Sequence, residues 1–210
     1  MGVIKQGILG GVSGKVANVV GSSWKGIAYL KALPLSVANP NTAAQQAQRG
    51  AMREIVSDSR LLLAALLQPF WNPFAQRQSG YNAYVSENIA QYDQTSLLTP
   101  AGLFASRGTL LNAPDAASVE GATDQDGVVT WTDNSGEADA LGTDEMHALV
   151  YNATDDKWFF FNTIGIRSAA TGAYVITDGN IGDVIHTWVF PSRPDISITS
   201  DSVYSTYTIA

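Results

Sequence analysis

The sequence predicts a mainly β protein with α-helices, in which a strand-plus-helix module at residues 1–105 precedes a β-sandwich at residues 106–210. Two observations carry this prediction. Apolar residues in the second half recur in short runs between turn residues, and the first half contains a long helical pattern. The 210 residues are 45% apolar and 15% charged, which supplies enough apolar side chains for a core and excludes a disordered chain.

The first forty residues combine glycines with β-branched residues, a pattern that predicts short strands joined by turns. We expect one strand around residues 15–20 and another around residues 26–31, with the residues between them in a turn. Pro34 and Pro40 then end this extended region.

A long helix is predicted over about residues 43–68. Thr42 and Gln45 have the spacing of a capping box, and apolar residues follow at helical intervals until Pro69, where we expect the helix to stop. The apolar run Leu61–Leu67 predicts that the last two turns are enclosed on nearly all sides. A second, shorter helix is expected over residues 81–92.

Seven short runs of strand-forming residues fill the second half, separated by Asn, Asp, Gly and Pro. Seven antiparallel strands in about a hundred residues are typical of an immunoglobulin-like or fibronectin-like sandwich, here without a disulfide because the chain has no cysteine. We therefore expect residues 106–210 to fold alone. The expected strands are Arg107–Leu111, Gly127–Thr132, Met146–Asn152, Lys157–Phe161, Ala173–Thr177, Asp183–Phe190 and Val203–Ile209.

Charge is divided unequally along the chain. Residues 1–53 contain six Lys or Arg and no carboxylate, whereas residues 111–210 contain three basic residues and fifteen acidic ones. A division of this kind indicates two parts that face different partners.

The basic N-terminal region supplies the candidate site. Its cations predict contact with an acidic surface of a neighbouring protein. Weak contact with nucleic acid, in which Trp24 stacks on a base, is the alternative. The candidate assembly contacts are Lys5, Lys15, Trp24, Lys25, Lys31, Arg49 and Arg53.

The motifs of common enzyme sites are missing. A phosphate-binding loop ending at Gly14 and Lys15 would need a glycine at position 9 and a hydroxyl at position 16, where Leu9 and Val16 stand. The only two histidines, His147 and His186, lie in separate predicted strands without a metal-ligand or nucleophile pattern around them. We therefore expect no catalytic residue, no metal and no cofactor, and a protein that is not an enzyme.

The sequence also predicts no membrane span and no export signal. Its longest unbroken apolar run, Leu61–Leu67, is far shorter than the roughly 18–20 residues that cross a bilayer. Near the N-terminus, polar residues and glycines interrupt any continuous apolar segment.

Several segments resemble an uncharacterised family of proteins of similar length from Bacteroidota and their phages. They are residues 2–10, the segment 14–26 with the sequence GKVANVVGSSWKG, residues 39–45 with Arg49, and the closing strand after Asp201. The chain departs from the family at Ala17, where glycine is usual. The family has no assigned activity, and the resemblance implies a structural role.

These observations lead us to expect a non-enzymatic component of a phage virion, either a capsid or a capsid-associated protein. Its N-terminal module would anchor the chain to other virion proteins and to copies of itself, and its β-sandwich would be displayed. The alternative is a β-sandwich module of the bacterial surface or periplasm that binds a glycan or a protein. The expected location is the virion, with the cell envelope or the cytoplasm as alternatives.

Overall fold

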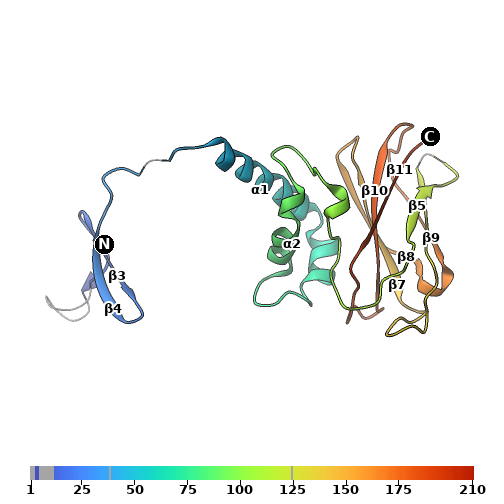
Figure 1. Cartoon of the computed structure of the whole chain (residues 1–210), viewed down its shortest axis with the longest axis horizontal. Coiled ribbons are helices and arrows are strands. Elements are labelled where there is room, and N and C mark those ends of the chain that lie inside the picture. The colour runs from blue at the N-terminus through green and yellow to red at the C-terminus, as the bar shows by residue number, and fades with distance from the viewer. Residues whose placement is uncertain (1–2, 5–11, 38, 124) are drawn as a thin grey trace. The chain divides into compact units, whose positions relative to one another are not determined.

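The computed structural model describes residues 3–4, 12–37, 39–123 and 125–210. The chain forms two compact units, Met1–Thr42 and Ala43–Ala210. The first unit contains one four-stranded sheet, and the second contains helices and two further sheets (Figure 1).

The sheet of the first unit is antiparallel, with the strand order β1-β2-β3-β4. Its strands are β1 (Val3–Ile4), β2 (Val12–Val16), β3 (Val19–Trp24) and β4 (Ile27–Ala32). The predicted strand at residues 15–20 is wrong in its bounds, because it spans a turn. Ala17 adopts a left-handed φ of 48°, so the chain reverses there between β2 and β3.

Gly21 lies inside β3 and not in the expected turn. The backbone of Val12 passes so close that a Cβ atom at residue 21 would lie 2.0 Å from the Val12 carbonyl oxygen. Glycine is therefore required here for a close backbone approach. The turn between β3 and β4 falls at Lys25 and Gly26, which have φ values of 47° and 84°.

The second unit begins with helices. They are α1 (Ala43–Leu61), the π-helix η1 (Leu63–Trp71), α2 (Gly80–Asn88) and the short 3₁₀ turns η2 (Ile89–Gln91) and η3 (Pro100–Gly102). The predicted stop at Pro69 is wrong, because η1 continues through this residue. Its hydrogen bonds span five residues, as from the Leu67 N–H to the Leu62 carbonyl at 3.1 Å, and this wider winding carries Phe70 and Trp71 into the core.

Two antiparallel sheets follow and confirm the seven-stranded sandwich. The three-stranded sheet has the order β5-β6-β9, and the four-stranded sheet has the order β11-β10-β7-β8. Their strands are β5 (Ala117–Glu120), β6 (Asp126–Thr130), β7 (Glu145–Asn152), β8 (Lys157–Ile166), β9 (Thr171–Val175), β10 (Val184–Ser192) and β11 (Val203–Thr208), and the 3₁₀ turn η4 (Arg167–Ala169) joins β8 to β9.

The segment Arg107–Leu111, expected as the first strand, forms no strand. It is held instead against the segment that precedes β11: the Leu110 N–H donates to the Thr199 carbonyl at 2.9 Å and the Gly108 N–H to the Asp201 carboxylate at 3.0 Å. The first strand of the sandwich is β5, which the sequence pattern did not reveal.

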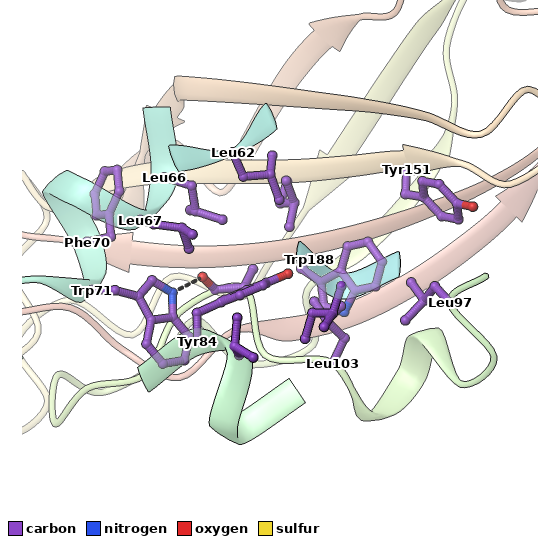
Figure 2. Packing of buried hydrophobic residues seen from close by; sticks show 14 of the residues in the cluster. Leu62, Leu66, Leu67, Phe70, Trp71, Tyr84, Leu97, Leu103, Tyr151 and Trp188 are labelled. Atoms are coloured by element: carbon purple, nitrogen blue, oxygen red, sulfur yellow. Dashed lines mark hydrogen bonds between the residues drawn. The ribbon is translucent and has the colours of Figure 1, made fainter. Parts of the chain in front are cut away.

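The four-stranded sheet is buried on both faces. Ala148, Val150, Ile185 and Val189 belong to a core that the two sheets share. The alternate residues of β7 and β10 belong to a second core shared with the helices. The members of this second core that Figure 2 labels are Leu62, Leu66, Leu67, Phe70, Trp71, Tyr84, Leu97, Leu103, Tyr151 and Trp188. The second unit therefore has three layers.

The expected domain boundary between residues 105 and 106 does not coincide with a division between compact units. The Trp188 indole N–H donates to the Pro100 carbonyl at 3.2 Å and the Ala105 backbone N–H to the Ser202 hydroxyl oxygen at 3.0 Å, so both bonds cross that boundary. The division lies between residues 42 and 43 because the helices use one face of the four-stranded sheet as their core.

Candidate functional site

The register of the first unit places three cross-strand rows on one face of its sheet. Lys15 of β2 is opposite Val20, which is opposite Lys31 of β4. Residues directly opposite one another in an antiparallel pair share a face. The same face carries the pairs Ser22–Tyr29 and Trp24–Ile27. We call this set of seven residues the lysine face.

The lysine face is open to solvent over most of its area. The exposed fraction is 65% for Trp24, 67% for Ile27 and 43% for Tyr29. Lys15 and Lys31 are exposed as well. Large apolar side chains of this kind normally lie in a core or at an interface, so this face has the composition of a binding surface.

The turn beside the lysine face adds a third cation. The Lys25 ammonium lies 4.8 Å from the centre of the Trp24 ring, a cation–π contact. Because Lys25 and Gly26 both adopt positive φ, they form a two-residue hairpin turn that fixes the direction of these side chains.

The opposite face of this sheet is aliphatic. Val19, Leu30 and Ala32 share it, and Leu30 has an exposed fraction of 62%. The sheet therefore exposes apolar side chains on both faces. Residues 1–42 contain four lysines and no carboxylate, so all charged side chains of this unit are positive.

A second basic surface lies on α1. Residues separated by three or four positions share one side of a helix. The side chains on this side of α1 line a shallow hollow of about 430 Å³. They are Arg49, Met52, Arg53, Val56, Ser57 and Arg60.

The predicted contact residues therefore fall into two groups. Lys15, Trp24, Lys25 and Lys31 lie in the first unit, on or beside the lysine face, and Arg49 and Arg53 lie on α1. Lys5 lies outside the described residues.

Sequence reasoning missed Tyr29 and Arg60. Tyr29 is two residues from Lys31, and this alternation in a strand was the available signal. Arg60 follows Arg53 by seven residues, which is two helical turns.

Both histidines contact other side chains of the sandwich. His147 is buried between the Ser192 hydroxyl, 2.8 Å from its Nε2 atom, and the Asn162 carbonyl, which contacts its Nδ1 atom. Burial lowers the pKa of His147 to about 3, so the ring is neutral at pH 7. The Ser192–His147 pair resembles a nucleophile and its base, but both residues are buried.

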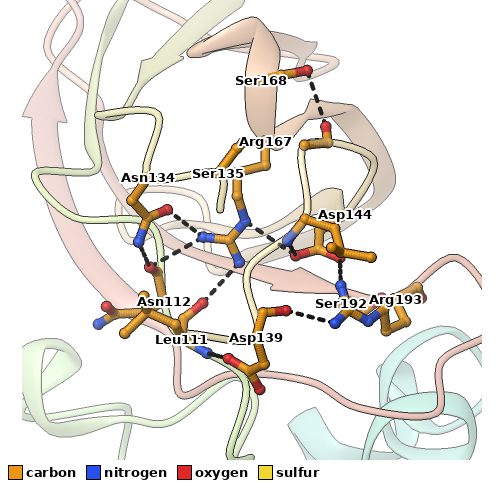
Figure 3. A network of polar contacts seen from close by, with 12 residues as sticks. Leu111, Asn112, Asn134, Ser135, Asp139, Asp144, Arg167, Ser168, Ser192 and Arg193 are labelled. Carbon is orange, nitrogen blue, oxygen red and sulfur yellow. Dashed lines mark hydrogen bonds and ion pairs between the residues drawn. The ribbon is translucent and has the colours of Figure 1, made fainter. Parts of the chain in front are cut away.

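A buried ionic network joins the loops at one end of the sandwich (Figure 3). Arg167 and Asp144 are fully buried, and the Arg167 Nε–H donates to Asp144 Oδ2 at 3.1 Å. The guanidinium of Arg193 donates to the other carboxylate oxygen at 2.5 Å. Arg167 also donates to Asn134 Oδ1 at 2.6 Å and to the Leu111 carbonyl at 2.7 Å. With its partners supplied by the chain itself, this network is a structural brace.

Asp58 and Tyr92 form a polar contact between the helices and the four-stranded sheet. The Tyr92 hydroxyl donates to Asp58 Oδ2 at 3.0 Å. The pKa of Asp58 is raised from 3.8 to about 6, first by burial and then by the charges of Asp156 and Glu54, while the hydrogen bond from Tyr92 partly offsets this. The hydroxyl of Tyr84 and the indole nitrogen of Trp158 are buried there without a hydrogen-bond partner.

Over the described ranges, no three His, Asp or Glu side chains gather where they could hold a metal ion. No helix in the part of the chain that the structure describes has the length and apolar character to cross a membrane.

Comparison with known proteins gives a matching family and a similar solved structure. The model of a family described as "Family of unknown function (DUF6266)" matches residues 11–205. Among curated proteins, none matches this chain. Among solved structures, an Fn3-like protein from Clostridium thermocellum is similar over 46% of this chain and 88% of its own, with 13% identity and a TM-score of 0.31.

Proposed function

Because the chain belongs to the DUF6266 family of unknown function, its role has to be inferred from its own surfaces, and we propose a non-enzymatic structural role in a phage virion. In this proposal the first unit anchors the chain to neighbouring proteins of the particle, and the second unit displays the β-sandwich. The match to the family model includes β2, β3 and β4 as well as the sandwich, so both units belong to the family pattern.

The observation that carries the proposal is the composition of the sheet in the first unit. Large apolar side chains are exposed on both of its faces, and its only charges are positive. A small sheet needs a packed face to be stable, and contact with another protein would supply one. The anchoring role therefore accounts for a surface that would be unfavourable in a free monomer.

Charge supports a partner that is acidic. Residues 43–210 contain all nineteen carboxylates of the chain and only eight of its Lys and Arg residues. The cations of the lysine face and of α1 match a negatively charged neighbour, whereas the acidic sandwich would repel other sandwiches and keep particles soluble. The virion setting rests on the resemblance to proteins of Bacteroidota and their phages.

The location can be tested by mass spectrometry of purified particles. We expect the protein in phage particles induced from a host culture, at a constant ratio to the other particle proteins across a density gradient. Recovery from the cell envelope, with none in particles, would contradict the virion role and favour the surface or periplasmic binding module.

The anchoring role can be tested with substitutions. We expect Trp24→Ser with Tyr29→Ser to reduce incorporation into particles strongly, because these changes remove the exposed aromatic rings of the lysine face. Val37→Ser is the matched control, since Val37 is 79% exposed and lies outside the sheet. Equal incorporation of the natural chain, the double variant and Val37→Ser would show that the anchor lies elsewhere.

A further inference from the structure

β4 is an edge strand with an exposed outer side. It is last in the order β1-β2-β3-β4, and no other strand in the described ranges pairs with it beyond β3. All six of its residues, Ile27–Ala32, are exposed.

The register shows which backbone groups of β4 point outward. The Leu33 N–H donates to the Asn18 carbonyl at 2.7 Å, which makes residues 18 and 33 a hydrogen-bonded pair. Because such pairs alternate along an antiparallel ladder, the odd-numbered residues of β4 point their N–H and C=O groups toward β3. The backbone groups of Ala28, Leu30 and Ala32 therefore point away from the sheet.

The edge of β4 carries little of the usual protection. Natural edge strands are shielded by proline, bulges or charged side chains. β4 contains no proline, and its register with β3 has no bulge. Its single charge is on Lys31, whose backbone faces β3. Such an edge is suited to accept another strand.

We propose that β4 pairs with β4 of a second copy of this chain, antiparallel and centred on Leu30. This inference rests on the proposed anchoring function and names a partner for the first unit. A two-fold axis normal to the sheet keeps like faces together, so residues of equal parity pair across it. Centring on Leu30 aligns all three outward-facing residues: Leu30 with its equivalent, and Ala28 with Ala32 of the second copy.

This register is self-complementary in its side chains. Tyr29 lies opposite Lys31 of the second copy, a cross-strand cation–aromatic pair, on the lysine face. The two Lys31 side chains are thereby kept apart, and Leu30 packs on its equivalent on the aliphatic face. Since the first units of the two copies are both cationic, we expect salt to strengthen this association, whereas salt weakens binding to an acidic partner.

Single cysteines can map the pairing, because the natural chain contains none. Under mild oxidation of the full-length protein, we expect Leu30→Cys to form a disulfide-linked dimer, since a residue at the two-fold axis lies opposite its equivalent. Tyr29→Cys and Lys31→Cys should each cross-link poorly alone and readily when mixed. Val37→Cys is the control for random collision. Failure of Leu30→Cys to exceed this control would overturn the proposal.

Charges introduced at the paired alanines give an independent test by analytical ultracentrifugation. The double variant Ala28→Lys with Ala32→Lys places two lysine pairs opposite one another, and we expect its self-association to weaken about tenfold. Mixing it with the double variant Ala28→Glu with Ala32→Glu should restore a heterodimer. A full-length chain that stays monomeric, yet still needs Trp24 and Tyr29 for particle incorporation, would overturn this pairing and leave the anchoring function intact.

Discussion

At the scale of single residues, two carboxylates of the second unit have different direct partners. Asp144 is held by two guanidinium groups at 3.1 and 2.5 Å, so its charge is compensated. Asp58 has only the hydroxyl of Tyr92 as its direct partner, and burial raises its pKa to about 6. The first carboxylate braces the sandwich, and the raised pKa of the second predicts that its contact with Tyr92 depends on pH.

Replacing Asp58 tests this sensitivity. The folded pKa lies above the unfolded value of 3.8, so the stability associated with protonated Asp58 is fully present below about pH 4 and is lost as pH rises through about 6. We expect Asp58→Asn, which keeps an acceptor for Tyr92, to stabilise the protein above pH 6 by about 1 kcal/mol after allowance for solvent screening. The measurement is urea unfolding from pH 4 to 8. Glu54→Gln is the matched control, and an unchanged pH profile in Asp58→Asn would contradict the interpretation.

Breaking the buried network should be far more costly than breaking an exposed pair. We expect Arg167→Met to lower the free energy of unfolding by about 3–5 kcal/mol, because Asp144 and two carbonyl groups lose a buried donor. Arg107→Met is the control: its pair with Asp201, at 3.3 Å, has exposed side chains and should contribute less than about 1 kcal/mol. Equal losses in denaturant unfolding would show that the network is not a brace.

At the scale of elements, local backbone geometry decides where strands and helices begin and end. The left-handed φ of Ala17 divides what looked like one strand, and the close approach of Val12 places Gly21 inside β3. The wide winding of η1 carries a helix past Pro69, where an α-helix would lose a hydrogen bond.

The role of Gly21 can be tested without disturbing the second unit. We expect Gly21→Val to disrupt the first sheet, because any side chain there collides with the Val12 carbonyl. Trypsin should then cleave after Lys15, Lys25 and Lys31 at least about tenfold faster, since local unfolding exposes these bonds. Ser23→Val, at an exposed position of the same strand, should leave cleavage unchanged. Unaltered protection of Gly21→Val would contradict the assigned contact.

At the scale of the molecule, the helices and the sandwich form one folding unit. The face of the four-stranded sheet that the helices cover includes Leu149, Tyr151, Trp188 and Phe190, all of them buried. Without the helices these side chains would meet water, at a cost of roughly 25 cal/mol for each Å² of apolar surface.

Truncation tests this organisation. We expect residues 43–210 to melt cooperatively, and residues 106–210 to melt broadly and bind a hydrophobic dye, because one face of the sheet has lost its cover. Calorimetry and dye fluorescence make the comparison. A sharp transition of residues 106–210 at the temperature found for residues 43–210 would restore the expected boundary at residue 106.

The sequence by itself determined the classes of element, because hydrophobic periodicity and turn residues are local signals. It predicted the seven-stranded sandwich and both helical segments, and it identified the cationic, carboxylate-free N-terminus. Only the tertiary structure decided that β7 and β10 are buried on both faces, that the helices share their core, and that Lys15, Trp24, Tyr29 and Lys31 meet on one face. The physical reason is that burial and register depend on residues far apart in the chain, and periodicity along one segment cannot reveal what packs against it.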